Sequence, residues 1–184
     1  MILTNFKDKE AVVKLLSSSF LKNKSVLSVC KNSKSISVLM EYSFIHSHYD
    51  NLAFTNESRT AVALCKISGK EKIHVRKFFI SIKLAFALGL KKAYFAMKHE
   101  KLISQHRKEK QYLHIQFIGV EPEKQGTKLG SKLIEDIKQY AKVNNLPIYL
   151  ETSTPKNIPF YQNHGFESFY TLKGEFDLYF FKYS

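Results

Sequence analysis

Hydrophobic positions along the chain alternate between helical and strand-like spacing. Apolar residues recur every three or four positions in long stretches, which predicts helices over about residues 9–20, 36–48, 71–105 and 127–143, the third broken at Gly89. Shorter runs rich in β-branched and aromatic residues predict strands at 2–6, 52–55, 60–67, 112–120, 147–151, 166–170 and 175–181. A short helix over 158–163 ends before Gly165, which fits a C-terminal cap. The pattern predicts one mixed α/β domain, of the α+β kind, over residues 1–184.

One stretch combines a strand, a loop with glycines and an amphipathic helix. The strand at 112–120 ends at Pro122, which cannot extend a hydrogen-bonded ladder. The loop Gln125-Gly126-Thr127-Lys128-Leu129-Gly130-Ser131 leads into the helix at 127–143. A helix N-terminus has unpaired N–H groups and a partial positive charge, and glycines let a ligand approach the backbone closely. We therefore interpret residues 125–131 as a phosphate-binding turn.

Length and composition are those of an ordinary globular protein. The 184 residues, 44% of them hydrophobic, can bury the core of one domain. The two cysteines, Cys30 and Cys65, form no disulfide framework and have no metal-ligand spacing. The N-terminus lacks the features of a secretory signal, and no apolar run reaches membrane-spanning length. We expect a cytoplasmic protein without a metal and without a membrane partner.

The net charge of +13 and a pI near 9.6 allow three interpretations. The charge could serve nucleic-acid binding, it could attract a polyanionic cofactor, or it could be a solvated basic surface. No helix-turn-helix signature, RNP-like aromatic strand or zinc-ligand pattern accompanies it. Nucleic acid is therefore not expected as a partner, although charge alone does not decide the question.

Two motifs resemble those of the GNAT superfamily of acyl-CoA-dependent N-acetyltransferases. The first is Val120-Glu121-Pro122 followed by Gln125 and Gly130, which is similar to the family's Val-x-Pro and Gln/Arg-x-x-Gly-x-Gly/Ala signature, with Lys128 in place of the middle glycine. The second, residues 150–161 (Leu-Glu-Thr-Ser-Thr-Pro-Lys-Asn-Ile-Pro-Phe-Tyr) followed by Gly165-Phe166, looks most like the puromycin N-acetyltransferase branch. The resemblance is dense over 110–170 and thin before that.

The resemblance implies a fold and a reaction. The fold would be a GNAT-type single domain, with a central mixed, mainly antiparallel sheet flanked by helices and a splayed strand pair that binds CoA. Residues 111–170 would form the acetyl-CoA-binding core, and the helices of residues 1–110 would shape the acceptor site. The reaction would move an acetyl group from acetyl-CoA to an amine of a small molecule, or of a protein or peptide, by direct transfer in a ternary complex. The alternatives are a CoA-binding protein without catalysis and a basic nucleic-acid-binding protein.

The same resemblance assigns residues to the cofactor. The backbone of Ile118, Gly119 and Val120 would pair with pantetheine as an added strand, with a bulge at Gly119 opening the gap. A main-chain N–H near Val120 would hold the developing oxyanion. Asn157 would hydrogen-bond the pantetheine arm, or cap the helix that follows it.

Lys128 departs from the family pattern at a position where glycine is preferred. Its side chain could crowd the pyrophosphate, or it could lie outward along the helix and add a positive charge for a phosphate. The second interpretation is favoured.

Tyr161 is the first candidate for catalysis. The resemblance aligns it with the tyrosine that protonates the departing CoA thiolate. General-acid catalysis of this kind contributes roughly 10²–10⁴-fold to rate. The alternative is a core tyrosine with its hydroxyl hydrogen-bonded.

The acceptor side offers weaker candidates. Glu151 ends a central strand, where partial burial would raise its pKa towards that of a general base, although it could equally receive backbone N–H groups. His114 and Gln116 are expected to share one face of the 112–120 strand with Ile118 and to line the acceptor pocket, although a histidine in such a place is more often a core residue with satisfied hydrogen bonds than a base. Glu41, on the helix at 36–48, is a further pocket candidate. The acceptor's identity and a homodimer both stay open.

Overall fold

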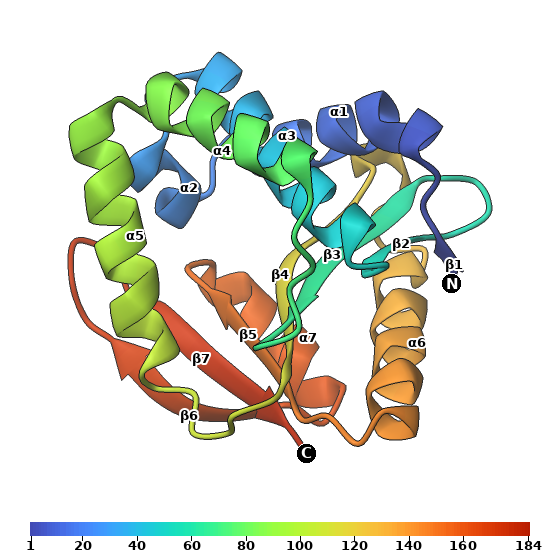
Figure 1. Cartoon of the computed structure of the whole chain (residues 1–184). Coiled ribbons are helices and arrows are strands. Elements are labelled where there is room, and N and C mark those ends of the chain that lie inside the picture. Colours follow the sequence, from blue (N-terminus) through green and yellow to red (C-terminus); the bar gives the residue numbers. More distant parts are fainter.

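The computed structural model describes residues 1–184 and contains one seven-stranded sheet with helices on both faces (Figure 1). In spatial order the strands are β1 (Ile2–Leu3), β2 (Ala53–Thr55), β3 (Ala61–Ile67), β4 (Leu113–Val120), β5 (Ile148–Thr152), β7 (Leu178–Tyr183) and β6 (Glu167–Leu172). Only β4 and β5 are parallel, and every other neighbouring pair is antiparallel. The mixed, mainly antiparallel sheet expected from the resemblance is confirmed.

The helices are α1 (Lys9–Ser19), α2 (Lys24–Val29), α3 (Ser33–Tyr49), α4 (Val75–Leu88), α5 (Leu90–Ser104), α6 (Leu129–Val143) and α7 (Ile158–Asn163). Short 3₁₀ turns occupy Phe6–Asp8, Pro122–Lys124 and Pro155–Asn157. None of these helices combines the length and the apolar character needed to cross a lipid bilayer.

Most predicted elements are present, and the observed ends differ from the predicted ones where a capping hydrogen bond sets the end of a helix. Helix α3 begins three residues earlier than predicted, because the Asn32 side chain accepts the Ser35 N–H and Ser35 in turn accepts the Asn32 N–H. Helix α2 was not predicted, since it has only six residues and buries only Val26. The break at Gly89 is confirmed, and that residue has a φ of 84° between α4 and α5.

Two hydrophobic cores lie on opposite faces of the sheet. Helix α6 packs Leu133, Ile134 and Ile137 against one face, together with Tyr161 from α7. Helices α1, α3 and α4 cover the other face, with side chains such as Leu16, Phe44 and Ile80. Apolar area removed from water on both faces supplies most of the stability, since each buried Leu, Ile or Phe contributes about 1.5–3 kcal/mol.

Strands β4 and β5 are paired over only the first part of β4 and then separate. Pairs between them run only from Leu113 to Ile115, opposite Ile148 to Leu150, whereas β3 stays paired with β4 as far as Val120. The second half of β4 therefore has no strand neighbour on its β5 side. This is the splayed strand pair that the resemblance implies.

A bulge lies at Gln116, and the expected bulge at Gly119 is wrong. Leu64 pairs with Phe117 and Cys65 with Ile115, so Gln116 is one extra residue in β4. The extra residue reverses the alternation of side chains, and Ile115 and Ile118 both pack into the core under α6. The expectation that His114 and Gln116 share a face with Ile118 is therefore also wrong.

Gly119 instead allows α1 to approach β4. A Cβ at this position would lie 2.9 Å from Leu16 Cδ2, 3.2 Å from Leu15 Cδ2 and 3.3 Å from Ser19 Oγ. Gly119 pairs regularly with Val62 in the sheet. Its lack of a side chain sets the distance between the helix and the strand.

We predict that Gly119→Ala destabilises the protein. The added methyl overlaps the Leu16 and Leu15 side chains, and overpacking of this kind costs ~1–3 kcal/mol of unfolding free energy. Gly174→Ala is the matched control, because its nearest atom would be 3.8 Å away. Urea unfolding of both variants checks the prediction, and equal midpoints would contradict it.

Candidate functional site

A groove of about 530 Å³ opens where β4 and β5 separate. One wall is the β4 segment Ile118–Val120, and another is the N-terminal turn of α6 with Gly126, Lys128, Leu129, Gly130 and Ser131. The first intrahelical bond of α6 runs from the Lys132 N–H to the Lys128 carbonyl, so the preceding amides have no carbonyl one turn earlier in the helix. The phosphate-binding turn predicted from sequence thus faces an open groove. Thr127, by contrast, uses its hydroxyl to donate to the Lys124 carbonyl.

The groove is positively charged throughout. Its lining includes Lys22, Lys124, Lys128 and Lys156 and no aspartate or glutamate. Gln125 folds back so that its Nε2 donates to the Val120 carbonyl at 3.4 Å. Free amides, a helix N-terminus and lysines fit the phosphates of a coenzyme A molecule.

Lys128 has a left-handed backbone conformation, with φ 63° and ψ 7°. Glycine is favoured in that region because any Cβ is crowded there, which gives a physical reason for a glycine at this position in related motifs. The Lys128 side chain is exposed. The outward interpretation is therefore the one that the geometry supports.

A second cavity, of about 930 Å³, lies beyond the groove, and the two share five lining residues: Phe20, Asn23, Ile118, Asn157 and Tyr161. Helices α2 to α5 and the strands β4 and β5 line it. His114, Gln116 and Glu151 all lie in its wall, as expected for the acceptor side. Two chambers that meet at a few side chains can hold two substrates side by side.

Tyr161 stands at the junction of the two cavities. The side chain is buried, and its hydroxyl makes no hydrogen bond to another protein group. Burial raises the pKa of Tyr161 to about 12, so the hydroxyl keeps its proton at neutral pH. Tyr161 is thus packed in the core, as the alternative predicted, but its hydroxyl lacks the protein hydrogen bond that the alternative also predicted.

Asn157 lies at the N-cap position of α7 but makes no capping hydrogen bond. Its amide belongs to the lining of both cavities. The capping alternative is therefore wrong, and the side chain is free to bind a ligand.

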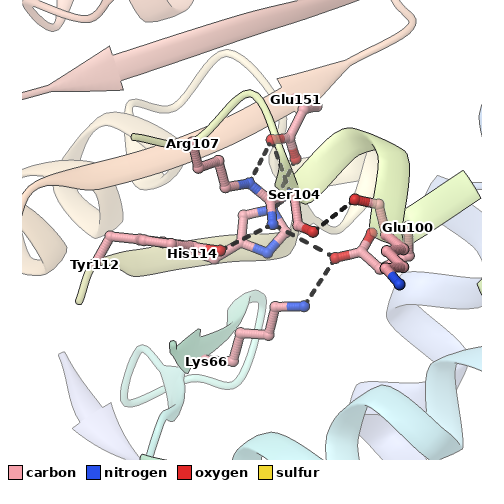
Figure 2. A network of polar contacts seen from close by, with 8 residues as sticks. Lys66, Glu100, Ser104, Arg107, Tyr112, His114 and Glu151 are labelled. Carbon is pink, nitrogen blue, oxygen red and sulfur yellow. Dashed lines mark hydrogen bonds and ion pairs between the residues drawn. The ribbon is translucent and has the colours of Figure 1, made fainter. Parts of the chain in front are cut away.

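A polar network forms part of the wall of the second cavity, and Figure 2 shows its side chains. Arg107, almost fully buried, contacts the Glu151 carboxylate through Nε at 3.0 Å and NH2 at 2.9 Å. The other oxygen of Glu151 lies 2.7 Å from His114 Nε2. Glu100 links Arg107, at 3.5 Å, to Lys66, at 3.0 Å.

The expected rise in the pKa of Glu151 is wrong. Burial does oppose its ionisation, but the charges and hydrogen bonds of His114 and Arg107 outweigh burial and lower its pKa to about 2. The carboxylate stays ionised at neutral pH and holds its two partners in place. A carboxylate in this state is a weak base.

His114 is better suited than Glu151 to accept a proton at neutral pH. Burial lowers its pKa, and the nearby Arg107 lowers it further, although Glu151 acts in the opposite direction. The ring is therefore neutral at pH 7. Nε2 lies 2.7 Å from the Glu151 carboxylate and 3.2 Å from Arg107 NH2, a group that can only donate. The shorter contact, with the charged carboxylate, favours a proton on Nε2, which puts the lone pair on Nδ1, a buried atom without a hydrogen-bond partner.

Glu41 does not line either cavity. It forms ion pairs with Lys9 at 3.1 Å and Lys83 at 2.6 Å, which join α3 to α1 and α4. Burial opposes its ionisation, yet the hydrogen bonds from the two lysines prevail and lower its pKa. The prediction of a pocket residue is wrong, because the carboxylate turns towards these helices.

Sequence reasoning missed Arg107, Glu100 and Lys66. Arg107 lies in the segment after α5, Glu100 in α5 and Lys66 in β3, so no local motif joins them. The dense basic stretch from Lys91 to Lys110 contains Arg107, but nothing in the pattern separates a buried guanidinium from its solvated neighbours.

Comparison with known proteins agrees with this geometry. Residues 92–168 match the family model of the acetyltransferase (GNAT) domain. Among solved structures, an acetyltransferase from Corynebacterium glutamicum described as histone acetyltransferase HPA2 and related acetyltransferase has a TM-score of 0.69 at 17% identity, covering 98% of this chain and 93% of that chain. Arylalkylamine N-acetyltransferase 2 from Aedes aegypti has a TM-score of 0.69 at 14% identity, covering 99% and 96%.

The polyamine N-acetyltransferase of Drosophila melanogaster, described as forming N-acetylagmatine, has a TM-score of 0.62 at 12% identity, covering 98% of this chain and 97% of that chain. Likeness at such low identity establishes the fold. The chain has the GNAT fold, and its match to the family model runs from α5 to the start of β6.

We predict that stability falls as pH drops below 6.5, in part because of His114. The unfolded chain takes up a proton at the ordinary pKa of 6.5, whereas the folded protein resists it. His114→Gln removes this contribution. As the pH is lowered, the unfolding free energy of the variant should therefore fall less steeply than that of the wild type, by up to about 1.4 kcal/mol per pH unit. Urea unfolding between pH 7 and pH 5 measures the difference.

The difference between wild type and variant isolates His114. His46 and His48 also have pKa values lowered mainly by burial, but both are retained in the variant. Glu151 affects the stability mainly below pH 4.5, where its carboxyl takes up a proton in the unfolded chain but stays ionised in the folded protein down to a pKa of about 2. Parallel pH dependence in the two proteins would refute the assignment.

Proposed function

We propose that this chain, which carries an acetyltransferase (GNAT) domain, transfers the acetyl group of acetyl-CoA to an amine of a small molecule, or of a peptide, in a ternary complex. One observation carries the proposal. A basic groove at the N-terminus of α6 meets a second cavity at Ile118, Asn157 and Tyr161. A thioester held in the groove would present its carbonyl to an amine in the cavity, and most of the rate gain would come from holding the two in line.

The donor site would use backbone more than side chains. The unpaired β5 side of β4, at Ile118 to Val120, is suited to pair with the amides of pantetheine as an added strand. Asn157 would hydrogen-bond the same arm, and amides and side chains from Gln125 to Ser131 would hold the pyrophosphate. A main-chain N–H near Val120 would stabilise the oxyanion.

His114 would act as the general base. The amine nitrogen attacks the thioester carbon, and its proton passes through a water to the neutral imidazole, because Nδ1 is buried and not open to direct contact with the amine. Glu151, held by Arg107, keeps the Nε2–H and so leaves the lone pair on Nδ1. Glu151 is then a positioning residue, which revises its expected role as the base.

Tyr161 would assist the leaving group. When the C–S bond breaks, the electron pair goes to sulfur, and the Tyr161 hydroxyl donates a hydrogen bond and then a proton to the thiolate. A pKa of about 12 guarantees that the proton is present before the reaction. After the products leave, the proton held by His114 passes through solvent to the Tyr161 oxygen, so that both side chains are neutral again.

The acceptor class follows from the second cavity. Half of its lining residues are hydrophobic, and its three carboxylates, Glu71, Glu100 and Glu151, are matched by the three cations Lys66, Lys101 and Arg107. We infer an amine with an apolar portion. The named substrates of two structural neighbours, arylalkylamines and agmatine, are amines of small molecules. The puromycin branch and a cytoplasmic location stay predictions from sequence.

An amine-library assay with acetyl-CoA, read by product mass, tests the function. Acetylated product from at least one amine is expected. Calorimetric titration with CoA separates the alternatives, since a CoA-binding protein without catalysis would bind but yield no product. Absence of CoA binding would refute the donor site itself.

We predict that Tyr161→Phe lowers kcat by roughly 10²–10⁴-fold while the Kd for acetyl-CoA changes little, because only the proton for sulfur is lost. Steady-state kinetics and calorimetry measure the two quantities. Tyr170→Phe, at an exposed position, is the control and should resemble the wild type. Unchanged turnover in Tyr161→Phe would remove it as the acid.

We predict that kcat/KM of the wild type is retained below pH 6.5 and declines only at the lowered pKa of His114. Glu151→Gln should move this decline to lower pH, because the Glu151 charge raises the pKa of His114. His114→Gln should lose the decline together with roughly 10²-fold or more of kcat. A pH profile of Glu151→Gln identical to that of the wild type would contradict the assignment.

A further inference from the structure

Helices α4 and α5 leave many large hydrophobic side chains in water. Ten of the eighteen exposed large hydrophobic residues in the chain lie between Ile73 and Met97. Phe86 is 74% exposed and Leu90 70% exposed, although side chains of this kind are usually buried in a core. The wide apolar arc predicted for the first of these helices is present, but only part of it is covered.

Eight of these residues lie on α4 and α5 outside the lining of the second cavity, and we call them the α4–α5 stripe: Val75, Phe78, Phe79, Ile82, Phe86, Leu90, Tyr94 and Phe95. Several are spaced four apart, which places them on one face of each helix. The other face of α4 packs on α3 through the buried Lys77, Ile80 and Leu88. In Figure 1, α4 crosses the top of the molecule and α5 descends along its left edge, on the opposite side from α6.

The stripe lies among cations. From Lys72 to His99 the chain has no aspartate or glutamate. Lys77 and Lys83 pair with Asp50 and Glu41, but five cations form no ion pair: Lys72, Arg76, Lys91, Lys92 and Lys98. Aromatic and aliphatic side chains flanked by lysine and arginine are the composition of helices that bind in the plane of a membrane interface.

We infer that the α4–α5 stripe docks on an anionic lipid surface. The phenylalanine and leucine side chains would enter the boundary between headgroups and acyl chains, and the unpaired lysines would contact lipid phosphates. The protein would lie on the bilayer without crossing it. This inference revises the expectation from sequence that the protein has no membrane partner, and it does not depend on the proposed acetyl transfer.

Charge selects lipid over a second copy of the chain. A symmetric dimer through the stripe would bring the same five cations of each copy together with no carboxylate between them, and like charges across an interface oppose association. An anionic bilayer supplies the missing negative charge and an apolar phase at once. Docking would also bury the exposed aromatic side chains against acyl chains, and removal of this apolar surface from water is favourable.

Docking would place the acceptor cavity next to the bilayer. Leu84, Ala85, Leu88 and Ala93 line that cavity from the same two helices that carry the stripe. The two helices thus separate the cavity from the surface on which the protein would rest.

The test is sedimentation of the full chain with vesicles, either phosphatidylcholine alone or phosphatidylcholine mixed with phosphatidylglycerol. Binding to the mixed vesicles is expected to be at least about tenfold stronger, and to weaken as salt screens the lysines. The chain has no tryptophan, so Phe86→Trp provides a single reporter. Its emission should shift to shorter wavelength with anionic vesicles only.

A matched pair of variants separates the stripe from net charge. Phe86→Ser with Lys91→Glu removes one exposed apolar and one basic residue of the stripe and should weaken vesicle binding about tenfold or more. Val143→Ser with Lys142→Glu makes the same changes on the exposed surface of α6 and should change binding by less than about twofold. Circular dichroism confirms that both variants fold.

Several outcomes would overturn the inference. These are no sedimentation with either vesicle, equal binding to the neutral and anionic vesicles, or equal loss in the two variants. A dimer in sedimentation velocity that is abolished by Phe86→Ser with Lys91→Glu, together with an emission of Phe86→Trp already at short wavelength without vesicles, would assign the stripe to self-association instead.

Discussion

The separation of β4 from β5 after Ile115 is the constraint on which the site depends. Two parallel strands that stayed paired would seal the sheet and leave no unpaired backbone edge at Ile118 to Val120. The bulge at Gln116 accompanies this separation and re-aims the side chains that follow it. The N-terminus of α6 then meets the gap, so that an anion-binding turn and a free strand edge face the same groove. Closing the gap would remove both.

The polar network depends on buried groups of opposite charge that neutralise each other. Arg107 and Glu151 are each costly to bury, and each lowers the cost for the other through two short contacts. Their pairing keeps the carboxylate ionised and fixes the imidazole of His114 with its lone pair on Nδ1. Removing one partner would leave the other charge buried without compensation, so the network stabilises the fold and sets the protonation of the site together.

Helices α4 and α5 illustrate how one element can serve two surfaces. Their inner side chains line the second cavity, and their outer side chains form the stripe. Lys77 shows how firmly the inner face is held, since it is buried against Asp50 with both carboxylate oxygens at 2.7 Å. The outer face has no such contact within the chain. An exposed apolar stripe without acidic residues is better explained by a partner than by folding.

Local pattern determined much of this protein: the helices and strands, the glycine-containing turn before α6, and the placement of Tyr161 and Asn157 after β5 are short-range features that spacing and turn residues encode. The pairing of Arg107 with Glu151, the ion pairs of Glu41 and the bulge at Gln116 were decided by tertiary structure. Each joins segments far apart in the sequence, and a pKa or a side-chain direction depends on which groups meet there. The expected base failed for this reason, because a glutamate in a strand has no pKa of its own until its neighbours are known.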